Sequence, residues 1–96
     1  MQATNSNVIG VVNGAYPYVQ DRMRGSDQIQ LPDGRVVSLN QINNATDASY
    51  AVRVLLSEYA QETGLLSLPR GVLEPHLGTL QNQATNLTNN FSANIL

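Results

Sequence analysis

The chain contains no cysteine, and its 96 residues are enough for one domain. Without cysteine, neither a disulfide bond nor a thiolate metal site can stabilise the fold. A domain of this length buries only a modest fraction of its surface. Its core is therefore expected to be marginal by itself, and contacts with other protein would add to its stability.

Charged side chains are also scarce. They make up 12% of the residues, whereas about 25% is usual. All five basic residues are arginine, so lysine is absent, and asparagine and glutamine fill many polar positions. A free monomer usually keeps a charged surface for solubility. An uncharged polar surface is suited to faces that contact other protein or line a water-filled channel. Compositional bias of the genome would give the same pattern.

Several partners and locations are not expected. The net charge is −2 and the sequence has no basic cluster. It therefore lacks the many basic side chains with which proteins contact nucleic-acid phosphates, and direct nucleic-acid binding is not expected. The sequence has no stretch of about 18 apolar residues, so no transmembrane helix is expected. The N-terminus has no basic region followed by an apolar run, so no secretory signal is expected. Export would then require a specialised route or a particle.

Residues 27–39 predict a β-hairpin. The sequence Pro32-Asp33-Gly34 lies between two apolar runs. Proline presets φ, aspartate accepts local hydrogen bonds, and glycine tolerates a positive φ. These three properties together predict a tight turn between two strands.

The register of this hairpin predicts one apolar face. If Leu31 faces Arg35, then Ile29 faces Val37 across the ladder, and side chains alternate between the two faces. The apolar face would carry Ile29, Leu31, Val37 and Leu39. A lone two-stranded hairpin is only marginally stable in water, so cover from a helix, a third strand or a neighbouring chain is expected.

Residues 1–26 predict an N-terminal arm. An apolar patch lies at residues 8–12, but Gly10 and Gly14 weaken a helix and Pro17 breaks one. Two structures stay open, a short helix capped by a preceding polar residue and an extended arm. We expect an apolar arm that docks on a neighbouring subunit.

Residues 40–96 predict an antiparallel helical hairpin. The first helix is expected from about Asp47 to Thr63, with a cap at Thr46 or Asp47 and a left-handed cap at Gly64. The second helix begins near Pro75, because proline is tolerated in the first turn. Its apolar residues recur at the heptad period, at positions Leu73, Leu77, Leu80, Ala84, Leu87 and Phe91.

The fold class expected from these segments is mainly α with one β-hairpin, an α+β arrangement in a single small domain. Its parts are an arm (1–26), a β-hairpin (27–39) and a helical hairpin (40–96). From Pro75 to Leu96 no charged residue occurs. This last helix is rich in asparagine and threonine, which have low helix propensity, so it is expected to depend on packing.

No residue pattern predicts catalysis. His76 is the one histidine, and no cysteine or carboxylate cluster accompanies it to bind zinc. Glu58 and Glu62 lie one turn apart on an expected exposed face, where a catalytic pair would need burial and perturbed pKa values. The glycines form neither a dinucleotide-binding nor a phosphate-binding loop. We expect no enzyme activity, no cofactor and no metal.

The expected function is that of a structural subunit in a multi-copy assembly, with contacts to itself and to other assembly proteins. The expected interface residues are Leu73, Leu77, Leu80, Leu87 and Phe91 of the second helix, with Ile29, Leu31 and Val37 of the hairpin. The order of segments, with an N-terminal arm, a β-hairpin and two C-terminal helices, resembles that of small subunits of axial assemblies, although no sequence motif is shared. These are minor tail or ejection proteins of bacteriophages, and rod or needle components of bacterial secretion and flagellar machines.

Two locations and one other function are compatible with this sequence. A virion protein is the first expectation and an exported cell-envelope component the second. The alternative function is a cytoplasmic adaptor or small chaperone that binds one partner through the helical hairpin.

Overall fold

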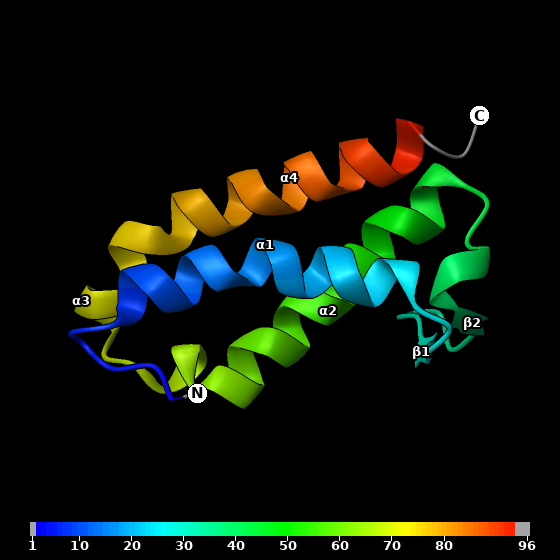
Figure 1. Ribbon diagram of the computed structural model, residues 1–96. Coiled ribbons are helices and arrows are strands. Elements are labelled where there is room, and N and C mark those ends of the chain that lie inside the picture. The colour runs from blue at the N-terminus through cyan, green and yellow to red at the C-terminus, as the bar shows by residue number, and fades with distance from the viewer. Residues whose placement is uncertain (1, 94–96) are drawn as a thin grey trace.

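The computed structural model of the protein describes residues 2–93. Three long helices pack against one another, and a two-stranded hairpin lies at one end of them (Figure 1). These elements are α1 (Val8–Arg24), β1 (Gln28–Gln30), β2 (Val36–Ser38), α2 (Ala45–Thr63) and α4 (Leu77–Ala93). Short helical turns join them, at Leu39–Gln41, Leu65–Ser67, α3 (Arg70–Leu73) and Glu74–His76. The predicted fold class, mainly α with one β-hairpin, is confirmed.

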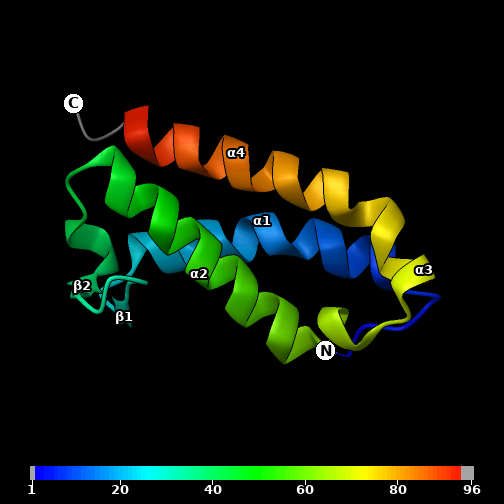
Figure 2. The same cartoon turned by 180° about the vertical axis from the view of Figure 1, so that it is seen from behind.

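The direction of the long helices defines the bundle. Seen from either side, α2 runs opposite to both α1 and α4 (Figures 1 and 2). Figure 2 shows α2 in front, crossing α1 obliquely. The predicted antiparallel hairpin of α2 and α4 is therefore present, and α1 completes a bundle of three helices.

The hairpin has the predicted register. Ile29 is paired with Val37 in the antiparallel ladder, and the Leu31 N–H donates to the Arg35 carbonyl at 2.8 Å. Gly34 has a φ of 92°, a backbone conformation that glycine adopts without steric cost. Local turn chemistry was therefore sufficient to place this element.

The ends of α2 are set by two caps. Asn44 caps the start, because its side chain accepts a hydrogen bond from the Asp47 N–H at 2.8 Å. The predicted cap, Thr46 or Asp47, is thus replaced by an earlier residue. At the other end Gly64 has the predicted left-handed conformation, with a φ of 79°.

Helix α1 replaces the expected N-terminal arm from Val8 onward. Pro17 lies inside it, where a proline costs about 3 kcal/mol. Complete burial of one valine contributes about 1.5–3 kcal/mol. Val11, Val12 and Val19 are each at most 1% exposed, so their burial outweighs the cost of the proline.

Gly14 gives α1 close contact with α2. A Cβ atom at this position would lie 2.6 Å from the Tyr59 hydroxyl oxygen. That hydroxyl donates to the Val11 carbonyl at 2.6 Å, and burial raises the pKa of Tyr59. The glycine that weakens α1 locally therefore allows a buried hydrogen bond between the two helices.

The chain covers its own hairpin. Ile29 and Leu31 lie in one core cluster with Val19 of α1, Leu55 of α2 and Leu87 of α4. Of the three forms of cover expected for the hairpin, helices of the same chain supply it. The N-terminal segment, which was expected to dock on a neighbouring subunit, packs from Val8 onward on the chain's own core. Of the two structures left open for this segment, the helix is the one present, and α1 supplies much of the surface on which the hairpin packs.

A short strap precedes α1. Ala3 is buried, and its N–H donates to the Thr63 carbonyl at the end of α2 at 2.6 Å. Asn7 holds the strap in a turn, because its side-chain oxygen accepts from the Thr4 N–H at 2.6 Å and its amide donates to the Gln2 carbonyl at 2.9 Å. Residues 2–7 are thereby fixed against the bundle.

Candidate interaction surface

The predicted seam of α4 faces the interior of the protein. Leu87 has no exposed surface and lies among core residues of α1, α2 and the hairpin. Phe91 is half-buried against the same cluster, and Leu73 and Leu80 are half-buried against a second cluster. The side chains expected at an oligomer interface therefore have neighbours within their own chain.

The remaining predicted interface residues divide in the same way. Ile29 and Leu31 are buried, and Val37 is half-buried beside them. Leu77 differs, because 50% of its surface is exposed. Contact of any of these residues with another subunit stays a prediction, and Leu77 is the most accessible of them.

An open groove of about 520 Å³ runs between α2 and α4. Its sides are uncharged apart from one arginine. The lining residues are Ser49, Arg53, Leu56 and Ser57 of α2, and Leu77, Leu80, Gln81, Ala84, Thr85, Thr88 and Asn89 of α4. Among residues 2–93 no carboxylate lies within ion-pair distance of Arg53. The groove thus presents hydroxyls, amides, leucine and alanine side chains, and one guanidinium.

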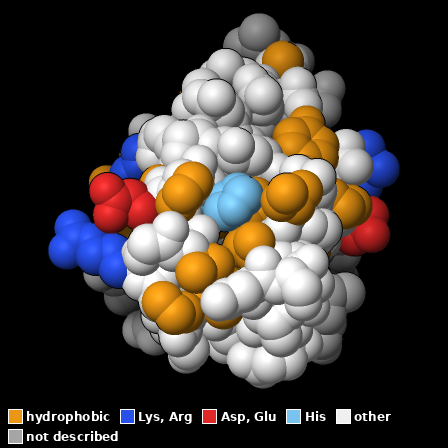
Figure 3. Space-filling model, turned by 90° about the vertical axis from the view of Figure 1, so that its left-hand side faces the viewer, with side chains coloured by type: hydrophobic (Ala, Val, Ile, Leu, Met, Phe, Trp, Pro, Cys, Tyr) orange, Lys and Arg blue, Asp and Glu red, His pale blue; other side chains and the backbone are white. Residues whose placement is uncertain are grey.

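The groove continues into an apolar area at the end of the bundle. Leu80 also lines a smaller hollow of about 170 Å³ with Leu56, Ala60 and Leu66. Leu66 is 60% exposed. Figure 3 views this end and shows hydrophobic side chains gathered around the histidine, which is His76. Exposed apolar area of this kind is typical of surfaces that bind protein.

Polar side chains of α4 hold it against α1. The Gln83 amide donates to the Val12 carbonyl at 3.2 Å, and the Asn90 amide contacts the Tyr16 hydroxyl. The helical period places them beside the seam, where long amide side chains reach the neighbouring helix.

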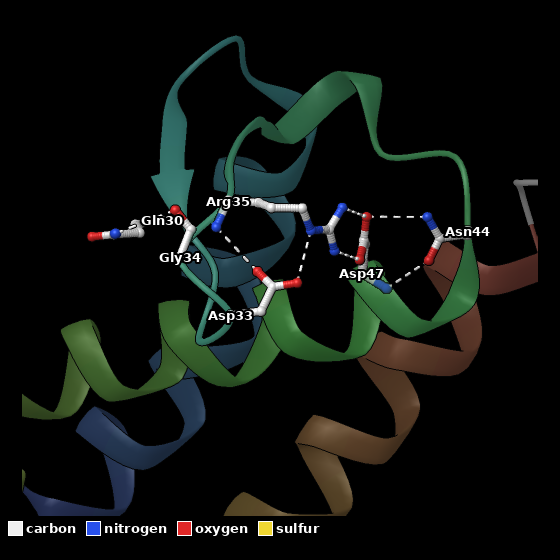
Figure 4. A network of polar contacts seen from close by, with 6 residues as sticks. All are labelled: Gln30, Asp33, Gly34, Arg35, Asn44 and Asp47. Carbon is white, nitrogen blue, oxygen red and sulfur yellow. Dashed lines mark hydrogen bonds and ion pairs between the residues drawn. The ribbon is translucent and has the colours of Figure 1, made fainter.

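An ion-pair network ties the hairpin turn to the start of α2 (Figure 4). Arg35 donates to both oxygens of Asp47, at 2.6 and 3.2 Å, and to Asp33 at 2.7 Å. The Asn44 amide also donates to Asp47, at 3.1 Å. Hydrogen bonds from Arg35 lower the pKa of Asp47 and of Asp33. With its acceptors engaged inside the protein, Asp47 has a stabilising role.

A second ion-pair cluster joins α1 to α2. Arg22 donates to the Tyr18 hydroxyl at 2.7 Å and to Glu58 at 3.2 Å. The rings of Tyr18 and Tyr59 lie 5.0 Å apart between centroids. Glu58, one of the carboxylates considered for catalysis, is thus an ion-pair partner. The aromatic pair belongs to the helix interface.

Groups able to bind a metal are not brought together in the described part of the chain, since residues 2–93 contain no cluster of three histidine, cysteine or carboxylate side chains. His76 is half-exposed in the turn before α4. Across the same residues, no helix is long and apolar enough to cross a membrane.

The chain matches no protein-family model, no curated protein and no solved structure.

Proposed function

We propose that this protein is a non-catalytic structural subunit that assembles with further copies of itself and with other proteins. The observation that carries the proposal is the open groove between α2 and α4, together with the exposed leucines at its end. That the protein is not an enzyme is part of this proposal.

The chemistry of the groove favours protein as its ligand. Burying an unpaired charge is costly, whereas hydroxyl and amide groups are buried at little cost when they form hydrogen bonds. Apart from Arg53, the α2–α4 groove carries only uncharged side chains. Leu66 is 60% exposed and Leu77 is 50% exposed. Burial of their apolar surface against another protein would stabilise the complex.

The preferred setting is a bacteriophage virion, as a minor tail or ejection protein. An axial component of a bacterial secretion or flagellar machine is the alternative. Both settings hold many copies in close contact, which suits a chain with no lysine and 12% charged residues. The location would then be the virion or the cell envelope.

Sedimentation velocity over a wide range of protein concentration tests the proposal. An assembly subunit shows mass above that of one 10.4 kDa chain, and the oligomer fraction rises with concentration. A single monomeric species at every concentration contradicts self-assembly.

A soluble adaptor is the second candidate, and a specific observation favours it. The hairpin and all three long helices share the chain's own core, so the fold does not require a neighbour for cover. An adaptor would be a stable monomer whose groove binds a segment of another protein.

A further inference from the structure

We infer that the groove between α2 and α4 binds a helical segment of another protein, in which a carboxylate pairs with Arg53 and an apolar side chain enters the adjoining hollow. The inference rests on the proposed function and specifies the chemistry of one of its protein partners. The carboxylate and the apolar side chain would lie about two turns apart along the bound helix.

The charge of Arg53 is uncompensated. Arg53 is exposed and is the one charged residue that lines the groove. Among residues 2–93 no carboxylate lies within ion-pair distance of it. An acidic residue three or four positions away on α2 could pair with it, but those positions hold Ser49, Tyr50, Leu56 and Ser57. A carboxylate that enters the groove from another protein would supply the missing ion pair.

The charges of the other four arginines are accommodated within the chain. Arg22, Arg35 and Arg70 each form an ion pair with a carboxylate. Arg24 is the last residue of α1, where the helix dipole favours a cation. Arg53 lies in the middle of α2, where the dipole has little effect. Of the five arginines, Arg53 is therefore the one that points to an acidic partner.

Apolar surface lies beside this charge. Leu56, Ser57 and Leu80 line both the groove and the smaller hollow of about 170 Å³, so the two are continuous. Ala60, which lines the hollow, follows Arg53 by seven residues, a distance of about 10 Å along the helix. A cavity of about 150 Å³ is able to hold benzene. The hollow therefore has room for one large apolar side chain.

A helix suits the shape of the groove. Helices α2 and α4 run side by side in opposite directions (Figure 2), and amphipathic helices bind apolar grooves of this kind. Helix α1 already packs on both of them in the core, through apolar side chains and an ion pair from Arg22 to Glu58 of α2. The groove offers the same combination on the solvent side, with a cation on α2 instead of an anion.

The groove also limits the charge of its ligand. The wall formed by α4 carries amides and hydroxyls, at Gln81, Thr85, Thr88 and Asn89, and no charged group. One carboxylate would pair with Arg53, whereas a second would lose water without gaining a partner. The face of the segment that contacts the groove should therefore carry a single acidic residue.

Selection from a displayed library of helical peptides, randomised on one face, tests this chemistry with the full chain as the target. Enriched peptides should carry one Asp or Glu at about seven residues from a Leu, Ile, Met or Phe. Selection on the Arg53→Glu variant should replace the acidic residue with Lys or Arg. Failure to enrich any peptide, or enrichment of peptides without an acidic residue, overturns the inference.

Matched charge reversals test the ion pair with a selected acidic peptide. Arg53→Glu and Arg24→Glu change the net charge equally at exposed positions, and Arg24 lines neither hollow. In fluorescence anisotropy, Arg53→Glu should bind the peptide at least about tenfold more weakly, and Arg24→Glu should bind it as the unmodified chain does. Circular dichroism should show both variants folded. Equal affinities of the two variants contradict a specific pair at Arg53.

A second matched pair tests the apolar contact. Leu66 is 60% exposed and lines the hollow, whereas Ile9 is 65% exposed on α1 and lines neither the hollow nor the groove. Leu66→Ser should weaken binding of the same peptide about fivefold through lost apolar burial, and Ile9→Ser should leave it unchanged. Equal binding by these two variants overturns the assignment of the apolar side chain to the hollow.

The failure of this inference can be distinguished from failure of self-assembly by sedimentation velocity without peptide. A monomeric chain that binds acidic peptides through Arg53 contradicts self-assembly and supports the inference. Oligomers together with peptide binding that does not depend on Arg53 support self-assembly and overturn the inference. Oligomers that Arg53→Glu dissolves, with no peptide selected, identify a second copy as the occupant and also overturn it.

Discussion

Helices α1 and α4 have the same length of 17 residues but are held in different ways. Six residues of α1 are buried, whereas Leu87 is the one buried residue of α4. Helix α1 also carries charges that pair with neighbours, such as Arg22 with Glu58, and α4 has none. The comparison indicates that α1 belongs to the core, while α4 retains area for another contact.

The largest expected effect comes from the single buried residue of α4. Leu87→Asp places a carboxylate in the core, at a cost comparable to a whole domain stability of about 5–15 kcal/mol. We expect loss of the folded state in circular dichroism and thermal unfolding. The control is Asn86→Asp at the adjacent exposed position, which should melt as the unmodified chain does. Normal melting of Leu87→Asp would show that α4 detaches without unfolding α1 and α2.

A pair of truncations compares the two helices directly. Val12→Ala in α1 removes two buried methyl groups and should destabilise by about 2 kcal/mol. Leu77→Ala in α4 changes a half-exposed side chain and should stay within about 0.5 kcal/mol. Urea unfolding measures both. Equal losses would mean that Leu77 is covered in solution, and their dependence on protein concentration would show whether a second copy covers it.

Glycine replacements probe the helical backbone itself. Neither Gly10 in α1 nor Gly78 in α4 has a neighbouring atom where a Cβ would lie. Changing either to alanine should stabilise by about 0.5–1 kcal/mol, measured as a rise in the urea midpoint. If α4 is the more weakly held helix, only Gly78→Ala should also slow amide hydrogen exchange within α4.

The smallest expected effect concerns pH. Asp47 has a pKa below its ordinary value of 3.8, chiefly through hydrogen bonds from Arg35. Its stabilising contribution is therefore complete above about pH 4–5 and is lost as the pH falls through the lowered pKa. Asp47→Asn should unfold more easily than the unmodified chain at pH 6, and this difference should shrink toward pH 2. Helix α4 has no titratable side chain, so hydrogen exchange in the hairpin should rise before exchange in α4.

The parts predicted correctly from the sequence depend on local chemistry. The turn at Gly34 and the cap at Gly64 follow from backbone preferences of single residues. Helix α1 was left open against an extended arm because Gly14 and Pro17 oppose a helix locally. The burial that compensates comes from α2 and α4. Tertiary packing overrode propensity there.

The contacts of α4 show a different limit of sequence reasoning. Heptad spacing correctly marked Leu80, Leu87 and Phe91 as residues that pack against protein. Spacing identifies a face but not the chain that covers it, so an interface between subunits was predicted for residues that α1 and α2 cover. The bond between Arg35 and Asp47 joins residues 12 positions apart, and no local pattern indicates such a pair.

The strap at residues 2–7 has a mechanical consequence. It is tied to Thr63 at one end of the bundle, and α4 ends at the opposite end (Figure 1). A pulling force applied through the strap and α4 would act along the helix axes, so the contacts between helices would be loaded in shear and would have to break together. Forced unfolding is governed by the unfolding rate. Tension along the bundle should therefore be resisted better than a force that peels α4 away sideways.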